Sequence, residues 1–299
     1  MRGHSLPLTD LSYFPGCSLE SSARESNLSL MKAAGILGLN LIELEDWNCC
    51  GSSSANILDK EIAFSLSVRN LSLAPPHRPL MAMCPRCLYH LREAHQRLAR
   101  EPETLRAQER RWGRPISLDL QIIHFLEVLV RLGPARLQQG LVRDLNGLKF
   151  MPYYGCTVFR PPALRQGTYY QGELGHVLSM LGGVPFTQAL THRCCGSFLS
   201  AARADVVTPL VNEIMASAVA AGAECLVTSC AMCQLNLEIR CTGEPRLPIF
   251  HFSEILALAL GAQDYEGWFS RHLVDPRPLL EARGLIGQES VQNRFSAPS

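Results

Sequence analysis

Residues 11–17 read Leu-Ser-Tyr-Phe-Pro-Gly-Cys, and residues 148–156 read Leu-Lys-Phe-Met-Pro-Tyr-Tyr-Gly-Cys. Each stretch is a short apolar and aromatic run that ends in a glycine and a cysteine. This pattern predicts a buried strand that carries a cysteine at its C-terminal end. The chain uses the arrangement twice, and the cysteines that follow repeat in the same way.

Ten of the twelve cysteines form two matching groups with the spacings C-x31-CC-x33-C-x2-C and C-x37-CC-x34-C-x2-C. The first group is Cys17, Cys49, Cys50, Cys84 and Cys87, and the second is Cys156, Cys194, Cys195, Cys230 and Cys233. The sequence Ile-His-Phe-Leu-Glu at residues 123–127 also returns as Phe-His-Phe-Ser-Glu at residues 250–254. The two kinds of repeat independently indicate a duplicated chain.

Apolar runs of strand length alternate with stretches of helical spacing in both halves. This predicts an α/β fold of two pseudo-duplicated cysteine-rich halves, each a small, mainly parallel sheet flanked by helices. We expect a first domain at residues 8–140, a second at residues 147–262 and a C-terminal extension at residues 263–299. Sites in such sheets lie beyond the C-terminal ends of the strands. The cysteines of each half should therefore meet at one edge of its sheet.

The bulk composition excludes several classes of function. A net charge of +1 with 18% charged residues gives no general attraction to nucleic acid. The longest apolar runs, such as residues 255–261, are far shorter than the roughly 20 residues of a spanning helix. Residues 1–10 lack the apolar core of a signal peptide. We expect a cytoplasmic protein with no membrane span and no nucleic-acid partner.

The cysteines themselves allow several chemistries. A disulfide framework is typical of small secreted scaffolds, which this long, core-rich chain does not resemble. The C-x2-C spacing places two sulfurs on one turn, where they can hold a metal. A zinc ion and a cubane iron–sulfur cluster each take four ligands, whereas a larger or non-cubane cluster could use all five thiols of a group. An iron–sulfur cluster is favoured, with zinc and metal-free catalytic thiols as alternatives.

These motifs resemble the cysteine-rich CCG domain, and two copies in one chain resemble heterodisulfide reductase and its relatives, in particular the catalytic B subunit. The likeness covers about residues 11–258 and includes Tyr-Gly-Cys at 154–156, Arg-Pro at 160–161, Cys-Cys-Gly at 194–196 and Cys-Ala-Met-Cys-Gln-Leu-Asn-Leu at 230–237. The resemblance implies a non-cubane [4Fe-4S] cluster in each half, held by the five cysteines of that half. Thr157 departs from the pattern, because relatives often carry histidine there, and this leaves the substrate open.

The resemblance further implies an oxidoreductase that acts on sulfur groups and reduces, or forms, a disulfide between two facing clusters. Electrons would come from an iron–sulfur subunit of the C type, which is served by a flavoprotein of the A type. One alternative is a sulfur-oxidising complex that acts on sulfane sulfur, with a lipoate-bearing carrier protein as partner. Others are the iron–sulfur subunit of a lactate, glycolate or glycerol-phosphate dehydrogenase, and a zinc-stabilised interaction module.

Outside the two cysteine groups, few residues are candidates for a role in catalysis or substrate binding. Arg160 and His192 lie near cysteines of the second group, where either could donate a proton or bind an anionic substrate. His124 and His251 open equivalent predicted helices, so we expect them to cap or pack. Cys225 begins an apolar strand and should be a buried small residue.

Overall fold

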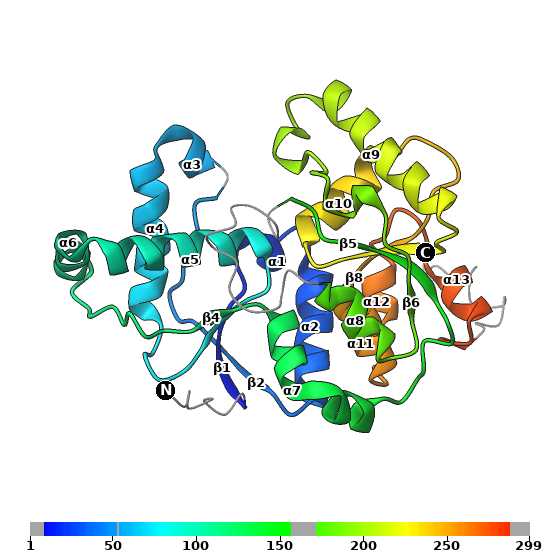
Figure 1. The fold of residues 1–299 in the computed structure, drawn as a ribbon, viewed down its shortest axis with the longest axis horizontal. Coiled ribbons are helices and arrows are strands. Elements are labelled where there is room, and N and C mark those ends of the chain that lie inside the picture. The colour runs from blue at the N-terminus through cyan, green and yellow to red at the C-terminus, as the bar shows by residue number, and fades with distance from the viewer. Residues whose placement is uncertain (1–8, 53, 157–171, 288–299) are drawn as a thin grey trace, which may run out of the picture.

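The computed structural model describes residues 9–52, 54–156 and 172–287. Within these ranges the chain forms two four-stranded sheets with helices around them (Figure 1). All neighbouring strands in the two sheets run parallel. The predicted α/β fold of two similar halves is therefore confirmed.

The first half contains a sheet of order β2-β1-β3-β4. Its strands are β1 (Asp10–Phe14), β2 (Asn40–Glu43), β3 (Leu80–Ala82) and β4 (Ile122–Ile123). Its helices are α1 (Cys17–Glu20), α2 (Arg24–Ile36), α3 (Ser54–Leu58), α4 (Lys60–Leu73), α5 (Pro85–Arg100), α6 (Pro102–Trp112) and α7 (Phe125–Gly140).

The second half repeats this order as β6-β5-β7-β8. Its strands are β5 (Lys149–Tyr153), β6 (Val184–Pro185), β7 (Cys225–Thr228) and β8 (Ile249–His251). Its helices are α8 (Glu173–Ser179), the short 3-10 turns η2 (Ala189–His192) and η3 (Ser197–Leu199), α9 (Ala204–Ala220), α10 (Ala231–Arg240) and α11 (Phe252–Ala259). The chain continues into α12 (Glu266–Phe269) and α13 (Arg277–Ala282).

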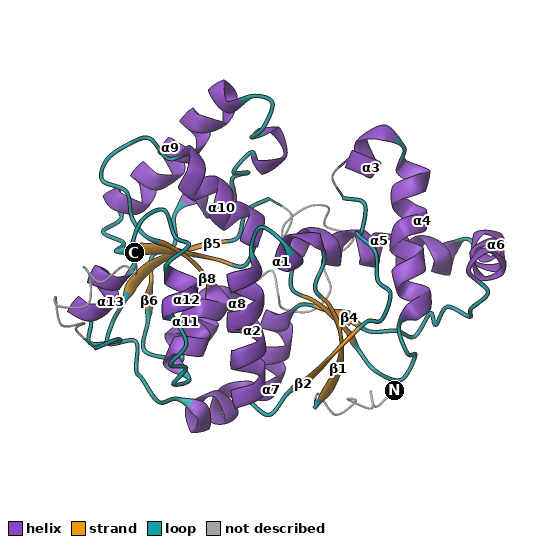
Figure 2. Cartoon of the chain, turned by 180° about the vertical axis from the view of Figure 1, so that it is seen from behind, coloured by secondary structure: helices purple, strands orange, loops and turns teal. Residues whose placement is uncertain are grey.

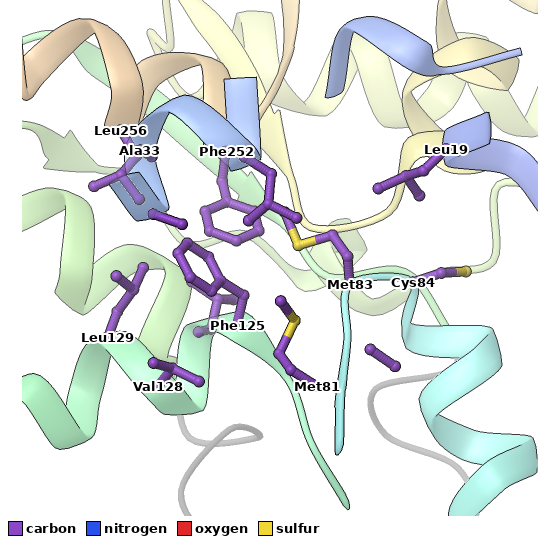
Figure 3. Packing of buried hydrophobic residues seen from close by; sticks show 14 of the residues in the cluster. Leu19, Ala33, Met81, Met83, Cys84, Phe125, Val128, Leu129, Phe252 and Leu256 are labelled. Atoms are coloured by element: carbon purple, nitrogen blue, oxygen red, sulfur yellow. The ribbon is translucent and has the colours of Figure 1, made fainter. Parts of the chain in front are cut away.

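One hydrophobic core cluster spans both halves, and a second cluster lies within the second half. Phe125 opens α7 and Phe252 opens α11, and their ring centroids lie 6.2 Å apart. Figure 3 shows these two rings next to Met83, which follows β3. The same core cluster includes buried residues of β1, β3, α2, α8 and α11. The domain boundaries proposed from the sequence remain a prediction.

Helix α2 packs on α11, and small residues are among those that it buries (Figure 2). The helical spacing of residues 21–37 predicts an apolar side with Leu28, Met31 and Leu37, but Leu28 and Met31 are 52% and 42% exposed, and Leu37 alone of the three is buried. Small residues such as Ser29 and Ala33 are buried instead. Ser29 Oγ lies 2.7 Å from Ser253 Oγ of α11, and small side chains allow this close approach.

Two further elements differ from the sequence-based expectation. The apolar run at residues 184–190 predicts a longer strand, but β6 is only two residues long. It is the edge strand of its sheet, where Val184 and Phe186 donate to Leu148 and Phe150 of the neighbouring segment, so that Pro185 can stand between them without loss of a hydrogen bond to β5.

The apolar spacing of Ile57, Ile62 and Leu71 predicts one helix after residue 54, but the structure divides it into α3 and α4 at Asp59. Among the described residues, no helix combines the length and apolar character that crossing a bilayer requires.

Asp59 divides the two helices because its carboxylate caps α4. Its Oδ1 accepts hydrogen bonds from the backbone N–H groups of Glu61 (2.8 Å) and Ile62 (3.4 Å). Asp59→Ala is expected to lower the free energy of unfolding by about 1 kcal/mol, measured by urea denaturation. Asp59→Asn keeps a capping oxygen and serves as the control. Equal losses in the two variants would contradict the capping role.

Candidate metal centre

The first cysteine group comes together beyond the C-terminal ends of β1 and β3, as the strand pattern predicted. Cys49 Sγ lies 3.6 Å from Cys17 Sγ, and Cys50 Sγ lies 3.2 Å from Cys87 Sγ. Hydrogen bonds between Cys49 and Cys50 and between Cys84 and Cys87 join these pairs. The five thiols thus form one connected row of sulfur atoms.

The second group lies beyond β5 and β7, where its hydrogen bonds form a set of three thiols and a pair. Cys195 Sγ lies 3.4 Å from Cys233 Sγ. Cys230 is hydrogen bonded to Cys233, and Cys194 to Cys156. All twelve cysteines of the chain, which include these ten, are free thiols in this structure.

The two groups touch each other at Cys84 and Cys230, which follow the equivalent strands β3 and β7. A hydrogen bond from the Cys230 thiol, with a second from Cys87, lowers the pKa of Cys84 well below its usual value. Cys230 accepts a hydrogen bond from Cys233, which lowers its pKa, but donation to Cys84 and burial raise the pKa overall. One row of thiols therefore connects the two halves.

Glycines make room for this row in both halves. Gly16 and Gly155 precede the first cysteine of each group and have φ of 74° and 66°, which favours glycine. A Cβ atom at Gly16 would lie 3.0 Å from Cys87 Sγ, and one at Gly155 would lie 3.3 Å from Cys233 Sγ. The shared geometry of the two halves thus leaves the space next to the C-x2-C sulfurs free of side chain.

The thiols influence one another strongly. Hydrogen bonds from Cys17 and then Cys50 lower the pKa of Cys49 to about 2, whereas the bond to Cys49 raises the pKa of Cys50 to about 12. Adjacent thiolates repel, so such a group is fully ionised only beside a positive charge. Five soft sulfur donors gathered at one sheet edge are the donor set of a thiolate-bound metal centre. Among the described residues, no three His, Cys, Asp or Glu side chains converge as ligands of a single ion.

His124 caps α7 and also holds the end of β3, as a capping role predicted. Its Nδ1 accepts from the Leu126 N–H at 3.1 Å, and its Nε2 lies 2.6 Å from the carbonyl oxygen of Met83, next to Cys84. Burial lowers the pKa of His124 to about 3, so the ring is neutral. His251 caps α11 in the same manner, with Glu254 completing a capping box.

A cavity of about 820 Å³ opens beside the second cysteine group. Residues of α4 and α5 line one side of it, and Cys156, Cys194 and Phe198 line the other. The residues that α4 and α5 contribute to the wall include Lys60, Phe64 and Arg86. The cavity therefore combines thiols, aromatic surface and charged side chains of both signs, because Glu61 and Glu93 also line it.

Of the two substrate candidates from the sequence, only His192 lies within the described residues, and it is not part of the cavity wall. Arg160 lies outside the described residues, as does Thr157. His192 is exposed, with its ring 5.3 Å from that of Tyr154, and it does not line the cavity. Cys225 is fully buried, as expected.

His90 lines the cavity and was not singled out from the sequence. It follows Cys87 by three residues on α5 and is 7% exposed. Burial, with Arg86 second, lowers its pKa to about 4. The sequence could have indicated that His90 lies near the cysteines, because residues three apart on a helix share a face and His90 follows Cys87 by three.

Several proteins are similar to this chain. A protein of Wolinella succinogenes named 8-methylmenaquinol:fumarate reductase membrane anchor subunit is 28% identical over 90% of this chain and 99% of its own length. The B subunit of the ferredoxin:CoB-CoM heterodisulfide reductase of Methanosarcina mazei is 23% identical over 85% of this chain and 90% of its own length. A heterodisulfide reductase B-subunit-like protein of Archaeoglobus profundus is 24% identical over 83% of this chain and 89% of its own length.

A crystal structure of a hypothetical protein from Helicobacter pylori has a TM-score of 0.68 at 12% sequence identity. The match covers 89% of this chain and about half, 52%, of that protein, and it supports the fold alone. The model of the CCG cysteine-rich domain matches residues 11–92 and 151–238, which is more than half of the chain. These two segments carry the two groups of five cysteines, and the chain belongs to the CCG cysteine-rich domain family.

Proposed function

We propose that this chain is the iron–sulfur subunit of a heterodisulfide reductase-like complex, and that it reduces a disulfide next to its cysteine groups. The observation that carries the proposal is the row of thiols that joins both groups through Cys84 and Cys230, together with the Cys156–Cys194 pair, which borders a cavity. Similarity over more than 80% of the chain to proteins named after the B subunit of heterodisulfide reductase supports it.

Each half would hold one cluster, of the non-cubane [4Fe-4S] type, through its own five cysteines. Thiolates are the usual ligands of iron–sulfur clusters, and each group brings five cysteines to one edge of its sheet. When bound, such clusters supply electrons one at a time. Reduction of a disulfide consumes two electrons and two protons and yields two thiols, which makes two adjacent sites useful.

The cavity would orient the substrate. Lys60 and Arg86 give its wall positive charge for an anionic group, and Phe64 and Phe198 offer surface for an apolar part. We propose that electrons come from a flavoprotein and an iron–sulfur subunit of the same complex, and that the complex is cytoplasmic. A carrier-bound sulfane sulfur would use the same cavity if the chain served an oxidative pathway.

The proposal is tested with anaerobically purified protein, reduced methyl viologen as electron donor and a panel of disulfides. Two thiols should form for every two electrons consumed. Turnover of viologen without any release of thiol would contradict the assignment.

Phe198→Ala is expected to lower kcat/KM for the preferred disulfide by about tenfold, because its ring is part of the cavity wall and is 65% exposed. Iron content should not change, since the side chain is not a ligand. Leu273→Ala, which is 59% exposed and outside the cavity lining, is the matched control. An unchanged kcat/KM in Phe198→Ala would place the substrate elsewhere.

A second candidate function is that of a membrane-associated protein in a quinol-linked reductase. The similarity to the Wolinella anchor protein extends over nearly the whole of both chains. Ile57, Leu58 and Ile62 at the α3–α4 corner are 76%, 84% and 53% exposed, which is unusual for large apolar side chains. Co-flotation with lipid vesicles and reduction by a menaquinol analogue, without disulfide turnover, would favour this function over the first.

A further inference from the structure

The two halves place opposite charges at equivalent buried positions. Arg92 follows Cys87 by five residues on α5, and Glu238 follows Cys233 by five residues on α10. The partner position is the same in both halves, because Glu127 and Glu254 complete the capping boxes of α7 and α11. The two positions hold an arginine and a glutamate in the first half, but two glutamates in the second.

In the first half, the buried negative charge of Glu127 is balanced by an arginine of the same half. Arg92 donates to Glu127 at 2.8 Å, and the two side chains are 2% and 5% exposed. Arg92 also donates to the carbonyl oxygen of Ile122 in β4. This buried pair ties the helix that follows the C-x2-C motif to the neighbouring strand and to α7.

The second half obtains its positive charge from the C-terminal segment. His272, just after α12, has a side chain that is 1% exposed. Its Nδ1 makes an ion-pair contact of 3.0 Å with Glu238 Oε1, and its Nε2 lies 3.1 Å from Glu254 Oε1. The side chains of Glu238 and Glu254 are 5% and 0% exposed, so His272 lies between two buried carboxylates.

The surroundings favour the charged imidazolium. Burial alone would lower the pKa of His272, but the negative charges of Glu254 and Glu238 raise it to about 10. Glu25 of α2 and Arg271 also lie near this cluster, and their charges oppose each other. Burial lowers the pKa of the neighbouring His251 to about 4, so that ring is neutral. The rings of Phe250 and Phe269 flank the imidazole at 5.7 Å and 5.9 Å and keep water away.

The charged cluster of His272, Glu238 and Glu254 is connected to the second cysteine group. Glu254 Oε2 accepts hydrogen bonds from the His251 N–H (2.8 Å) and from Gln234 Nε2 (3.3 Å). Gln234 directly follows Cys233 on α10. The Leu273 N–H donates to Glu238 Oε2 at 3.2 Å, so the C-terminal segment also binds α10 directly.

We propose that His272 is a positioning residue for the second cysteine group, where it supplies from the C-terminal segment the cation that Arg92 supplies in the first half. Without a cation the two buried carboxylates repel each other, and α10 with Cys230 and Cys233 loses its defined place. The first group keeps its own Arg92–Glu127 pair and is independent of this segment. The part that concerns metal binding rests on the proposed function.

The test uses the full-length chain with His272→Gln, which keeps the approximate size but removes the charge. The expected result is a fall in Tm of about 10 °C, together with loss of about half of the bound iron. The EPR signal that remains should equal the signal left when the cysteines of the second group are replaced. Arg271→Ala is the control on the same turn, because that side chain is 59% exposed and contacts Glu25 only at 3.8 Å.

A rescue variant separates charge from general damage. H272Q/E238R places an arginine opposite Glu254, as Arg92 lies opposite Glu127, and should recover most of the lost iron and Tm. The result that would overturn the proposal is a H272Q protein with the iron content and Tm of the R271A control. Equal loss of both cluster signals, or no recovery in the double variant, would also overturn it.

A metal-free measurement keeps this proposal distinct from the proposed function. In the apo protein, H272Q should increase amide exchange in residues 231–240 but not in residues 85–100. The Tm advantage of the natural chain over H272Q should be full below about pH 6.5 and decline as the pH rises through about 10, because the folded state holds the proton more tightly. Absence of iron in the natural chain would refute the proposed function, while these two readouts would still decide the role of His272.

Discussion

Cys84→Ser is expected to remove about half of the bound iron and to lower disulfide reduction by at least about 100-fold. Cys84 follows β3, is 7% exposed, and is hydrogen bonded to both Cys230 and Cys87. A serine hydroxyl is not ionised at neutral pH and is a poor ligand for soft metals, so the substitution removes a donor without a large change in volume. Iron per chain and thiol release are the measurements.

The matched control for this variant is Cys225→Ala. Cys225 is also buried, but it lies outside both groups at the start of β7, where burial raises the pKa of its thiol well above the usual value. It should therefore keep its proton and bind no metal, and the variant should keep its iron. Full iron content in Cys84→Ser would mean that Cys84 is not a ligand.

Arg92→Ala is expected to lower the free energy of unfolding by about 3–5 kcal/mol, because it leaves the Glu127 carboxylate buried without a cation. Burial raises the pKa of Glu127, and Arg92 opposes that rise. Urea denaturation of the metal-free chain measures the effect without a contribution from the cofactor.

Arg97→Ala provides the comparison on the same helix. Arg97 pairs with Glu61 and Glu101, but its side chain is 35% exposed, and surface pairs contribute at most about 1 kcal/mol. Replacing both Arg92 and Glu127 by apolar residues should be far less costly than Arg92→Ala alone, since no charge is then left buried. Similar losses in Arg92→Ala and Arg97→Ala would contradict this account of the buried pair.

The sequence predicted the strands and the helix caps well, because these features depend on the spacing of nearby residues. Apolar runs that end in Gly-Cys identified β1 and β5, and the parallel sheets follow from the alternation of strands and helices. The caps at His124 and His251 were also visible, since a histidine three residues before a glutamate opens each helix. These features depend on residues that are close in the chain.

Features that depend on distant residues were not predicted. The contact between Cys84 and Cys230 and the burial of Ser29 against Ser253 arise only when the two halves pack. His272 gave no sequence signal, because its partners Glu238 and Glu254 precede it and lie on other helices. The cavity residues come from α4, α5 and the second cysteine group, so the place of His90 became clear only in the fold.

The most direct test of the central claim is the iron and acid-labile sulfide content per chain of anaerobically purified protein, together with its EPR spectrum. Two cysteine groups that each hold a four-iron cluster predict about eight irons and about eight sulfides per chain. About two zinc ions without sulfide would contradict the claim and leave a structural module.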